Sequence, residues 1–366
     1  MSSKTHNPFY ARIRTILESA RSSAARSVNT AQVAANWLIG REIVEEEQRG
    51  KGRAGYGERL LAGLAQRLKR DYGNGFSVST LQYMRSFYTT YPSILTNQHA
   101  LRVNSSGRRG TGSIALKSWK PGMLHPDLSW THYRTLLRVE KADARAFYEI
   151  EAIGNGWSAR QLERQINSLL YERLAISRDK KGLLRLARTG QQVQKPADVF
   201  KDPLIMEFLG LPESQTLVET DLEQALIHNL QAFLLELGRG FAFVARQQRI
   251  TLDGDHFYID LVFYHAILKC HVLIDLKVGK LTHQDLGQMQ LYVNYYDRWR
   301  RSTGDNPALG LILCTDKNDA VVKYTLAGGD GKKIFASRYK LHVPTEAQLA
   351  TELRRELKML RRGGPP

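Results

Sequence analysis

Two aspartates and a lysine are the residues of this 366-residue chain whose types and spacing could perform chemistry. Asp260 lies in the apolar run 257–264 (FYIDLVFY), and Asp275 and Lys277 lie in the run 270–277 (CHVLIDLK). Both runs are short and rich in Val, Ile, Phe and Tyr, which is typical of β-strands, and the short break between their cores predicts a hairpin. Because side chains alternate along a strand, Asp275 and Lys277 are expected on one face, about 7 Å apart.

The expected register of this hairpin brings the two aspartates together. In a hairpin centred on Ile267 and Leu268, Asp260 lies opposite Asp275, and side chains that face each other across strands are close neighbours. Two carboxylates at such a distance repel each other unless a cation lies between them, and hard oxygen ligands on a rigid sheet suit Mg²⁺. A lysine beside such an ion is the expected partner of a phosphate or of a metal-bound water.

This arrangement resembles the PD-(D/E)xK nuclease core. The chain departs from that motif in two places, since Ile259 precedes Asp260 where proline is usual, and the second acid, Asp275, is aspartate where glutamate is more frequent. A D-x-K triplet also occurs by chance in many proteins. The flanking segments therefore decide between a catalytic site and a coincidence.

An upstream helix could contribute a third acid. An apolar stripe at helical spacing, closed by Gly238, predicts a helix that ends at this glycine; the stripe consists of Leu222, Leu226, Leu230, Phe233 and Leu237. Glu223 lies beside the stripe near the start of the helix. It either points toward the metal or forms a capping box with Thr220, and the sequence leaves both interpretations open.

The remaining strands of the core are also visible in the sequence. Residues 241–252 predict a first strand, and Asp253-Gly254 predicts a tight turn into the second. Asp255 is a competing acid, but its place in the turn favours a solvated loop carboxylate. The apolar run 309–314 predicts a buried strand.

Between the hairpin and that last strand, residues 284–298 have a helical pattern that puts Gln288 and Tyr292 on one face. This is the Q-x-x-x-Y spacing found after the D-x-K strand in many enzymes of the PD-(D/E)xK class. The resulting order, αβββαβ, predicts an α/β fold with a restriction-endonuclease-like core.

Longer segments make the resemblance specific. Residues 222–247, 257–265 and 273–297 are similar to the C-terminal domain of the YhcG-type family of PD-(D/E)xK proteins, and residues 74–92 (NGFSVSTLQYMRSFYTTYP) and 156–166 (GWSARQLERQI) are similar to its N-terminal domain. The resemblance covers residues 8–360, with 95–126 the poorest fit. It implies a metal-dependent nuclease, and a homodimer is a further expectation because nucleases of this fold often pair to cut two strands.

The resemblance also implies roles for individual residues. The implied ligands of Mg²⁺ or Mn²⁺ are Glu223, Asp260, Asp275 and the main-chain carbonyl of Leu276. Lys277 would orient the attacking water or stabilise the developing charge, and Gln288 would hold the geometry of the site with Tyr292 beside it. The four core positions all hold competent residue types, so nothing in the sequence suggests a degenerate site.

The positive charge of the chain is concentrated in its first part. The net charge is +17 overall, and residues 1–200 hold 32 Lys and Arg against 16 Asp and Glu, whereas residues 201–366 hold 21 against 20. A basic half of this size suggests a polyanionic partner, of which nucleic acid, DNA before RNA, is the obvious one. The alternative is a solvated basic surface that only aids solubility.

The chain exceeds the usual size of one domain, so two domains are expected. Residues 8–176 would form a helical nucleic-acid-binding domain with a flexible basic loop at 97–126, residues 177–204 a linker, and residues 205–362 the nuclease-like domain. Helices are expected at 8–25, 30–49, 56–71, 78–91, 129–139, 141–153, 158–175 and, as an amphipathic C-terminal helix, 346–362.

Residues 75–92 resemble the second helix of a helix-turn-helix, which would present Gln82, Arg85 and either Tyr88 or Tyr91. Arg and Gln side chains read bases in the major groove, whereas aromatic residues at this spacing are more often core. Arg85 is therefore a candidate nucleic-acid contact.

A second candidate pair lies on a later helix. Ser158 and Gln161 form a capping-box start, and Arg160 and Arg164 lie four apart on one side, where they either contact phosphate or form a solvated face. Residues 107–113 (GRRGTGS) lack the lysine of a phosphate-binding loop, so nucleotide hydrolysis is rejected.

The remaining composition argues for a soluble cytoplasmic protein. Cys270 and Cys314 fall in predicted strands without the spacing of a zinc site, and no run of about 18 apolar residues suggests a membrane span. His265 lies too far along its strand from Asp260 to join the site and is expected to pack at the hairpin tip.

Two functions from different classes remain open at this stage. The first is a Mg²⁺-dependent nuclease. The second is a non-catalytic nucleic-acid-binding component of a defence or repair complex, because a fold alone does not establish chemistry. The retained acids argue against the second, since a binding surface would gain from losing negative charges near phosphate. An unrelated α/β protein would require the whole resemblance to be coincidental.

Overall fold

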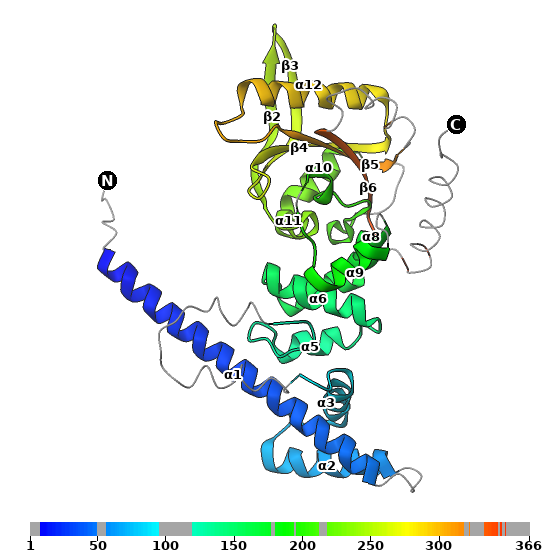
Figure 1. Ribbon diagram of the computed structural model, residues 1–366. Helices are drawn as coiled ribbons and strands as arrows, with labels where there is room; N and C mark the ends of the chain where they lie inside the picture. Colours follow the sequence, from blue (N-terminus) through cyan, green and yellow to red (C-terminus); the bar gives the residue numbers. More distant parts are fainter. Residues whose placement is uncertain are drawn as a thin grey trace. The chain divides into compact units, whose positions relative to one another are not determined.

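A computed structural model describes residues 8–49, 56–94, 119–176, 180–193, 195–211, 218–317, 322, 333–342, 345 and 348. The chain forms two compact units, Met1–Glu163 with Leu184–Gly190, and Arg164–Leu183 with Gln191–Pro366. The first unit is helical, and the second contains the sheet (Figure 1). The segment 107–113 and the expected helix at 346–362 lie outside the described residues, except for position 348, as does most of the expected loop at 97–126.

Helices make up the regular structure described in the first unit. They are α1 (Pro8–Arg49), α2 (Tyr56–Tyr72), α3 (Val78–Thr90), α5 (Trp130–Leu136) and α6 (Ala142–Asn155), together with the start of α7 (Ala159–Asn167) and most of α9 (Lys180–Thr189). The two helices expected at 8–25 and 30–49 are one continuous helix, α1. No glycine or proline lies between them to end the helix.

Helix α3 confirms the helix expected at 78–91, and its aromatic side chains pack toward the interior of the first unit. Phe87 and Tyr91 are buried, and the Tyr91 hydroxyl donates a hydrogen bond of 2.7 Å to the buried carboxyl group of Glu149. Tyr88 packs edge-on against Trp37, with ring centroids 5.1 Å apart. Tyr91 is therefore unavailable to a base, whereas Tyr88 is half-buried.

The second unit is built on a six-stranded sheet in the order β1-β6-β5-β4-β3-β2. The strands β2, β3 and β4 are antiparallel to one another, and β4, β5, β6 and β1 are parallel. The strands are β1 (Leu204–Ile205), β2 (Phe241–Leu252), β3 (Asp255–His265), β4 (Cys270–Lys280), β5 (Leu309–Asp316) and β6 (Ile334–Lys340).

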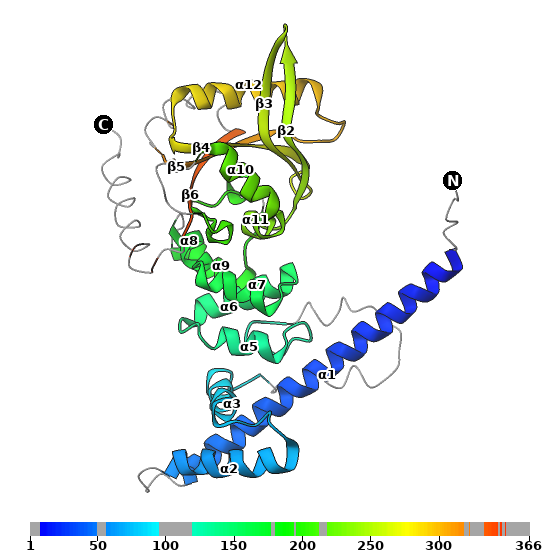
Figure 2. The ribbon, with the colours of Figure 1, turned by 180° about the vertical axis from the view of Figure 1, so that it is seen from behind.

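Helices cover both faces of this sheet. On one face α10 (Glu219–His228) and α11 (Leu230–Leu237) share a buried apolar cluster with alternate strand residues such as Leu261, Ile274 and Leu276. On the other face α12 (His283–Trp299) packs on the intervening residues (Figures 1 and 2). This alternation is the pattern of a sheet buried on both sides, and it confirms the expected αβββαβ core.

Several details of the core differ from the expectations. The single helix expected over 222–237 breaks at Asn229 into α10 and α11, although it ends as expected at Gly238. Strands β1 and β6 are additional, and the segment 177–204 contains α9 (Lys180–Thr189) and the first residue of β1. Two-residue β1 is too short to give a periodic signal, because it forms only through its distant partner β6.

Candidate active site

The hairpin that carries the aspartates has the expected register. The β3–β4 ladder runs from His265 opposite Cys270 to Leu261 opposite Ile274, which centres the hairpin between Ile267 and Leu268. Turn length therefore fixes which residues face each other. Asp260 and Asp275 follow immediately beyond the last pair.

The pairing of β3 with β4 ends at Leu261, so the two strands separate at Asp260. Instead of a further ladder pair, the Asp260 carboxylate accepts a hydrogen bond from the main-chain N–H of Leu276, with 2.7 Å between Oδ2 and N. The side chain thus takes over a backbone donor that the departing strand leaves unpaired. Burial raises the pKa of Asp260 above its ordinary value, against the opposing effect of this hydrogen bond and of Lys277.

Asp275 is the most deeply buried acid of the site. It is 2% exposed, and its Oδ2 lies 3.2 Å from Lys277 Nζ. This oxygen makes no well-aligned hydrogen bond with any residue that the structure describes. Burial, and then the neighbouring charge of Asp260, raise the pKa of Asp275 to about 7, although Lys277 acts in the opposite direction. The expectation that Asp275 and Lys277 share one face is confirmed.

Lys277 is surrounded by acids, two of which the sequence analysis missed. Its Nζ lies 3.6 Å from Glu219 Oε2 and 4.0 Å from Asp285 Oδ1, besides its contact with Asp275. Burial would lower the pKa of Lys277, but Asp275 and these acids outweigh it and raise the pKa. Glu219 opens α10 and accepts a hydrogen bond from the Val278 N–H. Acids are common in a first helical turn, so the sequence offered no specific signal.

Glu223 does not form the alternative capping box. Helix α10 begins at Glu219, so Thr220 already lies inside the helix. The Glu223 carboxylate instead accepts a hydrogen bond of 2.7 Å from the Gln247 side-chain amide, and the same nitrogen donates to Asp260 Oδ1 at 3.0 Å. Gln247 therefore connects the third acid to the pair on the sheet.

Gln247 is a further residue that the sequence analysis missed. It lies in β2 opposite Asp260 and has a positive φ of 44°, a conformation that residues other than glycine rarely adopt. The residue pairs on either side of it are Arg246 with Leu261 and Gln248 with Ile259. A glutamine in a strand sequence carries no mark of this conformation, so only the structure could identify it.

Gln288 and Tyr292 connect α12 to the hairpin. The Gln288 amide donates to the Tyr292 hydroxyl, which in turn donates to the main-chain carbonyl of Tyr258 at 2.8 Å. Tyr292 is fully buried, and its burial raises its pKa. The expected Q-x-x-x-Y pair therefore lies against the strand that carries Asp260, two residues from that aspartate.

The acidic side chains of the site are the donors available to a divalent metal. Among the described residues, no group of three His, Cys, Asp or Glu side chains has an arrangement ready to hold an ion. The chemistry of the donors nevertheless fits a hard cation, because Asp275 is a buried and Asp260 a half-buried carboxyl group, and burial and charged neighbours raise the pKa of both. The amide of Gln247 lies between Glu223 and Asp260.

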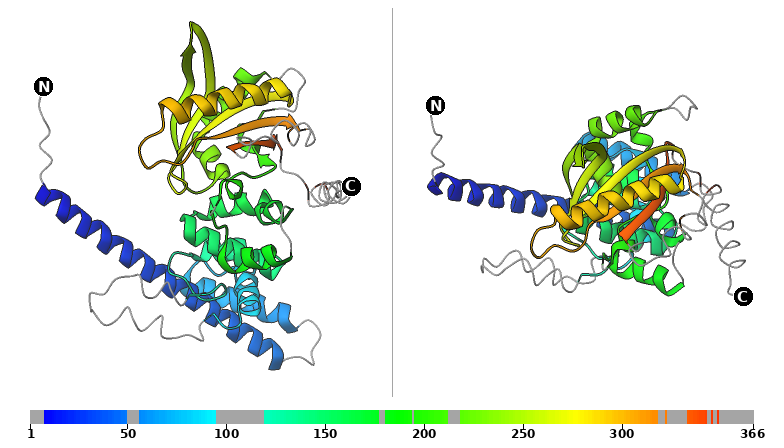
Figure 3. Two further views of the ribbon diagram at one scale, coloured as in Figure 1. Left: turned by 45° about the horizontal axis from the view of Figure 1, so that its top comes forward. Right: turned by 90° about the horizontal axis from the view of Figure 1, so that it is seen from above.

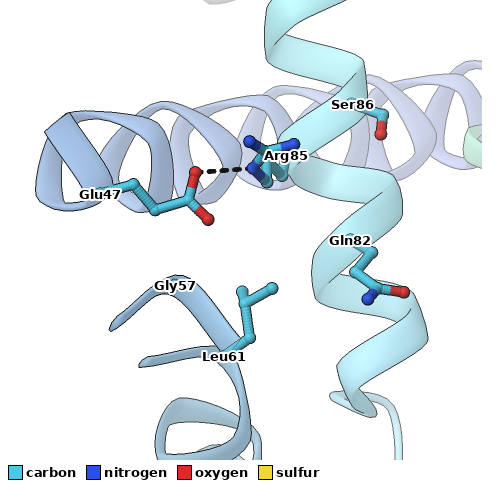
Figure 4. A pocket seen from close by; sticks show the side chains of 6 residues that line it. All are labelled: Glu47, Gly57, Leu61, Gln82, Arg85 and Ser86. Atoms are coloured by element: carbon cyan, nitrogen blue, oxygen red, sulfur yellow. Dashed lines mark hydrogen bonds and ion pairs between the residues drawn. The ribbon is translucent and has the colours of Figure 1, made fainter. Parts of the chain in front are cut away.

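The three arginine candidates have different environments. Arg85 pairs with Glu47, with 2.6 Å between Nε and Oε2, beside a pocket of about 500 Å³ in the first unit (Figure 4). Arg160 is exposed. Arg164 is unsuitable for phosphate, because its guanidinium lies in the second unit, 2.9 Å from Glu207 and 3.3 Å from Glu236.

The histidine and cysteines lie outside the site, as expected. His265 is fully buried and accepts a hydrogen bond from the Leu268 N–H in the hairpin turn. Cys270 and Cys314 are buried free thiols. Among the described helices we found none with the length and apolar character to cross a bilayer.

Comparisons with known proteins show which family the chain resembles. A family model described as "YhcG PDDEXK nuclease domain" matches residues 197–358, and one described as "DUF1016 N-terminal domain" matches residues 12–173. An Escherichia coli (strain K12) protein named "Putative nuclease YhcG" is 40% identical over 353 residues, which are 95% of this chain and 93% of that protein.

Solved structures give weaker matches. A repair endonuclease from Pyrococcus abyssi is 16% identical, with a TM-score of 0.24 over 36% of this chain and 50% of that one. An EndoMS–dsDNA complex is 11% identical, with a TM-score of 0.26 over 37% of this chain and 50% of that one. The chain thus spans about half the length of these solved structures.

The fold and the family match define a PD-(D/E)xK nuclease. The chain belongs to the YhcG family, with a DUF1016-type N-terminal domain followed by the nuclease domain.

Proposed function

We propose that this nuclease is a Mg²⁺-dependent phosphodiesterase that acts on nucleic acid, on DNA in preference to RNA. The observation that carries the proposal is the buried carboxyl group of Asp275, which lies 3.2 Å from Lys277 where β3 separates from β4. A buried acid without a full set of hydrogen bonds is costly unless a cation compensates it. Lys277 is shared with two other acids, Glu219 and Asp285, so it compensates the charge of Asp275 only in part.

The implied ligands are Asp260, Asp275, the main-chain carbonyl of Leu276 and Glu223. A bound Mg²⁺ or Mn²⁺ would polarise the scissile phosphate and lower the pKa of a nearby water. Oxygen donors from one rigid sheet suit such an ion. Glu223 would join this set beside its hydrogen bond with Gln247, which uses one of its two carboxylate oxygens.

The protein's own side chains would orient the reacting groups. Lys277 is the cation nearest to Asp275, so its ammonium would donate to a phosphate oxygen or to the attacking water and stabilise the charge that develops. Tyr292, hydrogen-bonded to the Tyr258 carbonyl, would fix the strand that presents Asp260, and Gln288 would hold the Tyr292 hydroxyl.

The basic helical domain, expected over residues 8–176, would supply affinity through the phosphate backbone. Residues 1–200 hold a net charge of +16, against +1 for the rest of the chain. Arg160 is an exposed candidate contact, and Arg85 is a candidate only if its ion pair with Glu47 opens. Binding of this kind is independent of sequence and weakens with salt.

The test is a cleavage assay on the purified full-length protein. Single-stranded DNA, double-stranded DNA, branched DNA and RNA are each incubated with Mg²⁺, with Mn²⁺ and with EDTA. We expect cleavage of at least one DNA substrate that requires the divalent ion. Equal cleavage in EDTA, or no cleavage of any of these substrates under any condition, would contradict the proposal.

A further inference from the structure

The β2–β3 hairpin continues beyond the site, and its far half has two unlike faces. The hairpin extends past the neighbouring strands (Figure 3). On the face toward α12, Ile250 and Ile259 are 1% and 0% exposed and belong to the same apolar cluster as that helix. On the other face Arg249 and Tyr258, which lie opposite each other, are exposed. In the far half of the hairpin, therefore, the face toward α12 is packed and the face that carries Arg249 and Tyr258 is exposed.

Gln247 determines which residues form the exposed face. In a regular strand Ile259 and Val262 would point to opposite faces, because their numbers differ by three. Both side chains nevertheless pack in the α12 cluster, so the regular alternation of side chains between the two faces is interrupted between Ile259 and Val262. The positive φ of Gln247, opposite Asp260, is where this interruption occurs in β2. Arg249 and Tyr258 are thereby turned to the face opposite α12.

The exposed pair is continuous with the site. Tyr258 precedes Asp260 by two residues in the same strand, which is roughly 7 Å. Its side chain is 47% exposed, although its main-chain carbonyl is held by Tyr292. Farther along the same face, Thr251 and His256 form a hydrogen bond with 3.0 Å between Oγ1 and Nδ1. A substrate strand that enters the site can extend along this face.

We propose that this face, which we call the hairpin platform (Arg249, Thr251, His256 and Tyr258), binds an unpaired segment of the substrate strand next to the scissile phosphate. The Tyr258 ring would stack on a base, and the Arg249 guanidinium would contact the adjoining phosphate. Exposed aromatic residues interleaved with cations are the general means of binding single strands. The platform rests on the proposed nuclease function and adds a preference for single-stranded ends or flaps over continuous duplex.

The test is binding of fluorescein-labelled single-stranded and duplex DNA to the full-length protein by anisotropy. Ca²⁺ replaces Mg²⁺ so that the acids are compensated, and the DNA is checked for integrity afterwards. Tyr258→Ala is expected to weaken single-strand binding by roughly 5- to 100-fold, the range for one lost base stack, with a much smaller effect on duplex. Tyr258→Phe keeps the ring and should bind within about twofold of wild type, a change smaller than the loss expected for Tyr258→Ala.

Matched controls lie at the end of α12. Trp299 is 65% exposed, so Trp299→Ala removes an exposed aromatic ring outside the platform and should leave binding unchanged. Arg249→Ala should make the slope of log affinity against log salt shallower by the amount expected for one lost phosphate contact. Arg298→Ala should leave that slope unchanged. Thermal unfolding of each variant verifies that it is folded.

Two failures are distinguishable. If wild-type protein neither binds nor cuts any nucleic acid, the proposed function fails and the platform falls with it. If wild type cuts DNA but Tyr258→Ala binds single strands as tightly as wild type, or loses duplex binding equally, only the platform is overturned.

Discussion

Gln247 is the residue that connects two acids of the site, Glu223 and Asp260. Its amide nitrogen lies 2.7 Å from Glu223 and 3.0 Å from Asp260, so one neutral donor interacts with both carboxylates. A metal ion that binds these same oxygens has to compete with the hydrogen bonds. We therefore expect the side chain to lower the free energy of the metal-free site more than that of the metal-bound site.

Removing that amide should tighten metal binding. For Gln247→Ala we expect Mn²⁺ affinity to rise by about 3- to 10-fold, because a hydrogen bond to a charged group at an exposed position is lost only from the metal-free state. Calorimetric titration of the protein without nucleic acid measures this. Gln248→Ala is the matched control, since Gln248 bonds to the Arg249 carbonyl. Unchanged Mn²⁺ binding in Gln247→Ala would show that the amide does not compete with the ion, and weaker binding would show that it supports the metal-bound form.

Among individual residues, the sequence predicted the pair Asp260 and Asp275 but did not identify Gln247 beside it. Asp260 and Asp275 could be paired because a short turn and strict alternation fix a hairpin's register. Gln247 could not be found, since a positive φ at a glutamine depends on the whole sheet. Arg164 was misassigned because its ion partners Glu207 and Glu236 lie more than forty residues away.

Among the elements, α11 is fixed by a buried charge network. Glu236 is fully buried and pairs with Arg173 at 2.6 Å, with Arg164 at 3.3 Å, and with the Ile205 N–H at 3.0 Å. Burial would raise the pKa of Glu236, but Arg173, Lys201 and Arg164 outweigh it and lower the pKa to about 2. The network joins α11 to α7, α8 (Leu170–Ile176) and β1 within the second unit.

This network predicts a defined dependence of stability on pH. A lowered pKa in the folded state means that Glu236 stabilises the fold fully above its ordinary pKa of 4.5, and that this contribution is lost as the pH falls toward 2. Its size is on the order of 3 kcal/mol. Glu236→Gln should destabilise the second unit by about 3–5 kcal/mol at pH 7, because the arginines lose their partner.

Chemical denaturation of wild type and Glu236→Gln between pH 7 and pH 2.5 measures both effects. The difference between the two proteins should shrink as the pH falls. Glu163→Gln is a suitable control, since Glu163 pairs with Arg138 at an exposed position. A difference that stays constant with pH would mean that Glu236 is not ionised in the folded protein.

The elements themselves were predicted unevenly, for a physical reason. Strand β2 spans Phe241–Leu252, as expected, because an Asp-Gly turn ends it, and Asp253 and Gly254 both have positive φ. The break of the helix at Asn229 was not predicted, since the apolar stripe continues through it. Local signals fix turns, whereas breaks and short parallel strands depend on distant packing.

For the whole molecule, the uneven charge predicts salt-sensitive binding. If the basic residues of the first part contact the phosphate backbone, log affinity should fall linearly with log salt, with a slope of about −0.9 per contact on duplex DNA. Arg160→Ala should make that slope shallower by about one contact without changing stability. Arg164→Ala, four residues away, should instead lower stability, because its partners Glu207 and Glu236 are left unpaired.

Anisotropy titrations at several salt concentrations measure the slope for both arginine variants, and thermal unfolding in parallel measures their stability. A flat dependence on salt in the wild type would mean that the basic surface serves solubility and not binding. Equal behaviour of the two arginine variants would contradict the different environments of Arg160 and Arg164.

The most direct test of the whole account is single-turnover cleavage of DNA by Asp275→Asn and Lys277→Ala in Mg²⁺, beside duplex binding by the same proteins. We predict that both variants lose cleavage by at least about 100-fold, because each removes a charge that acts on the reacting phosphate. Duplex binding should stay within about threefold of wild type, since the basic first part supplies it. Variants that cleave DNA at the wild-type rate would show that the chemistry lies elsewhere in the chain.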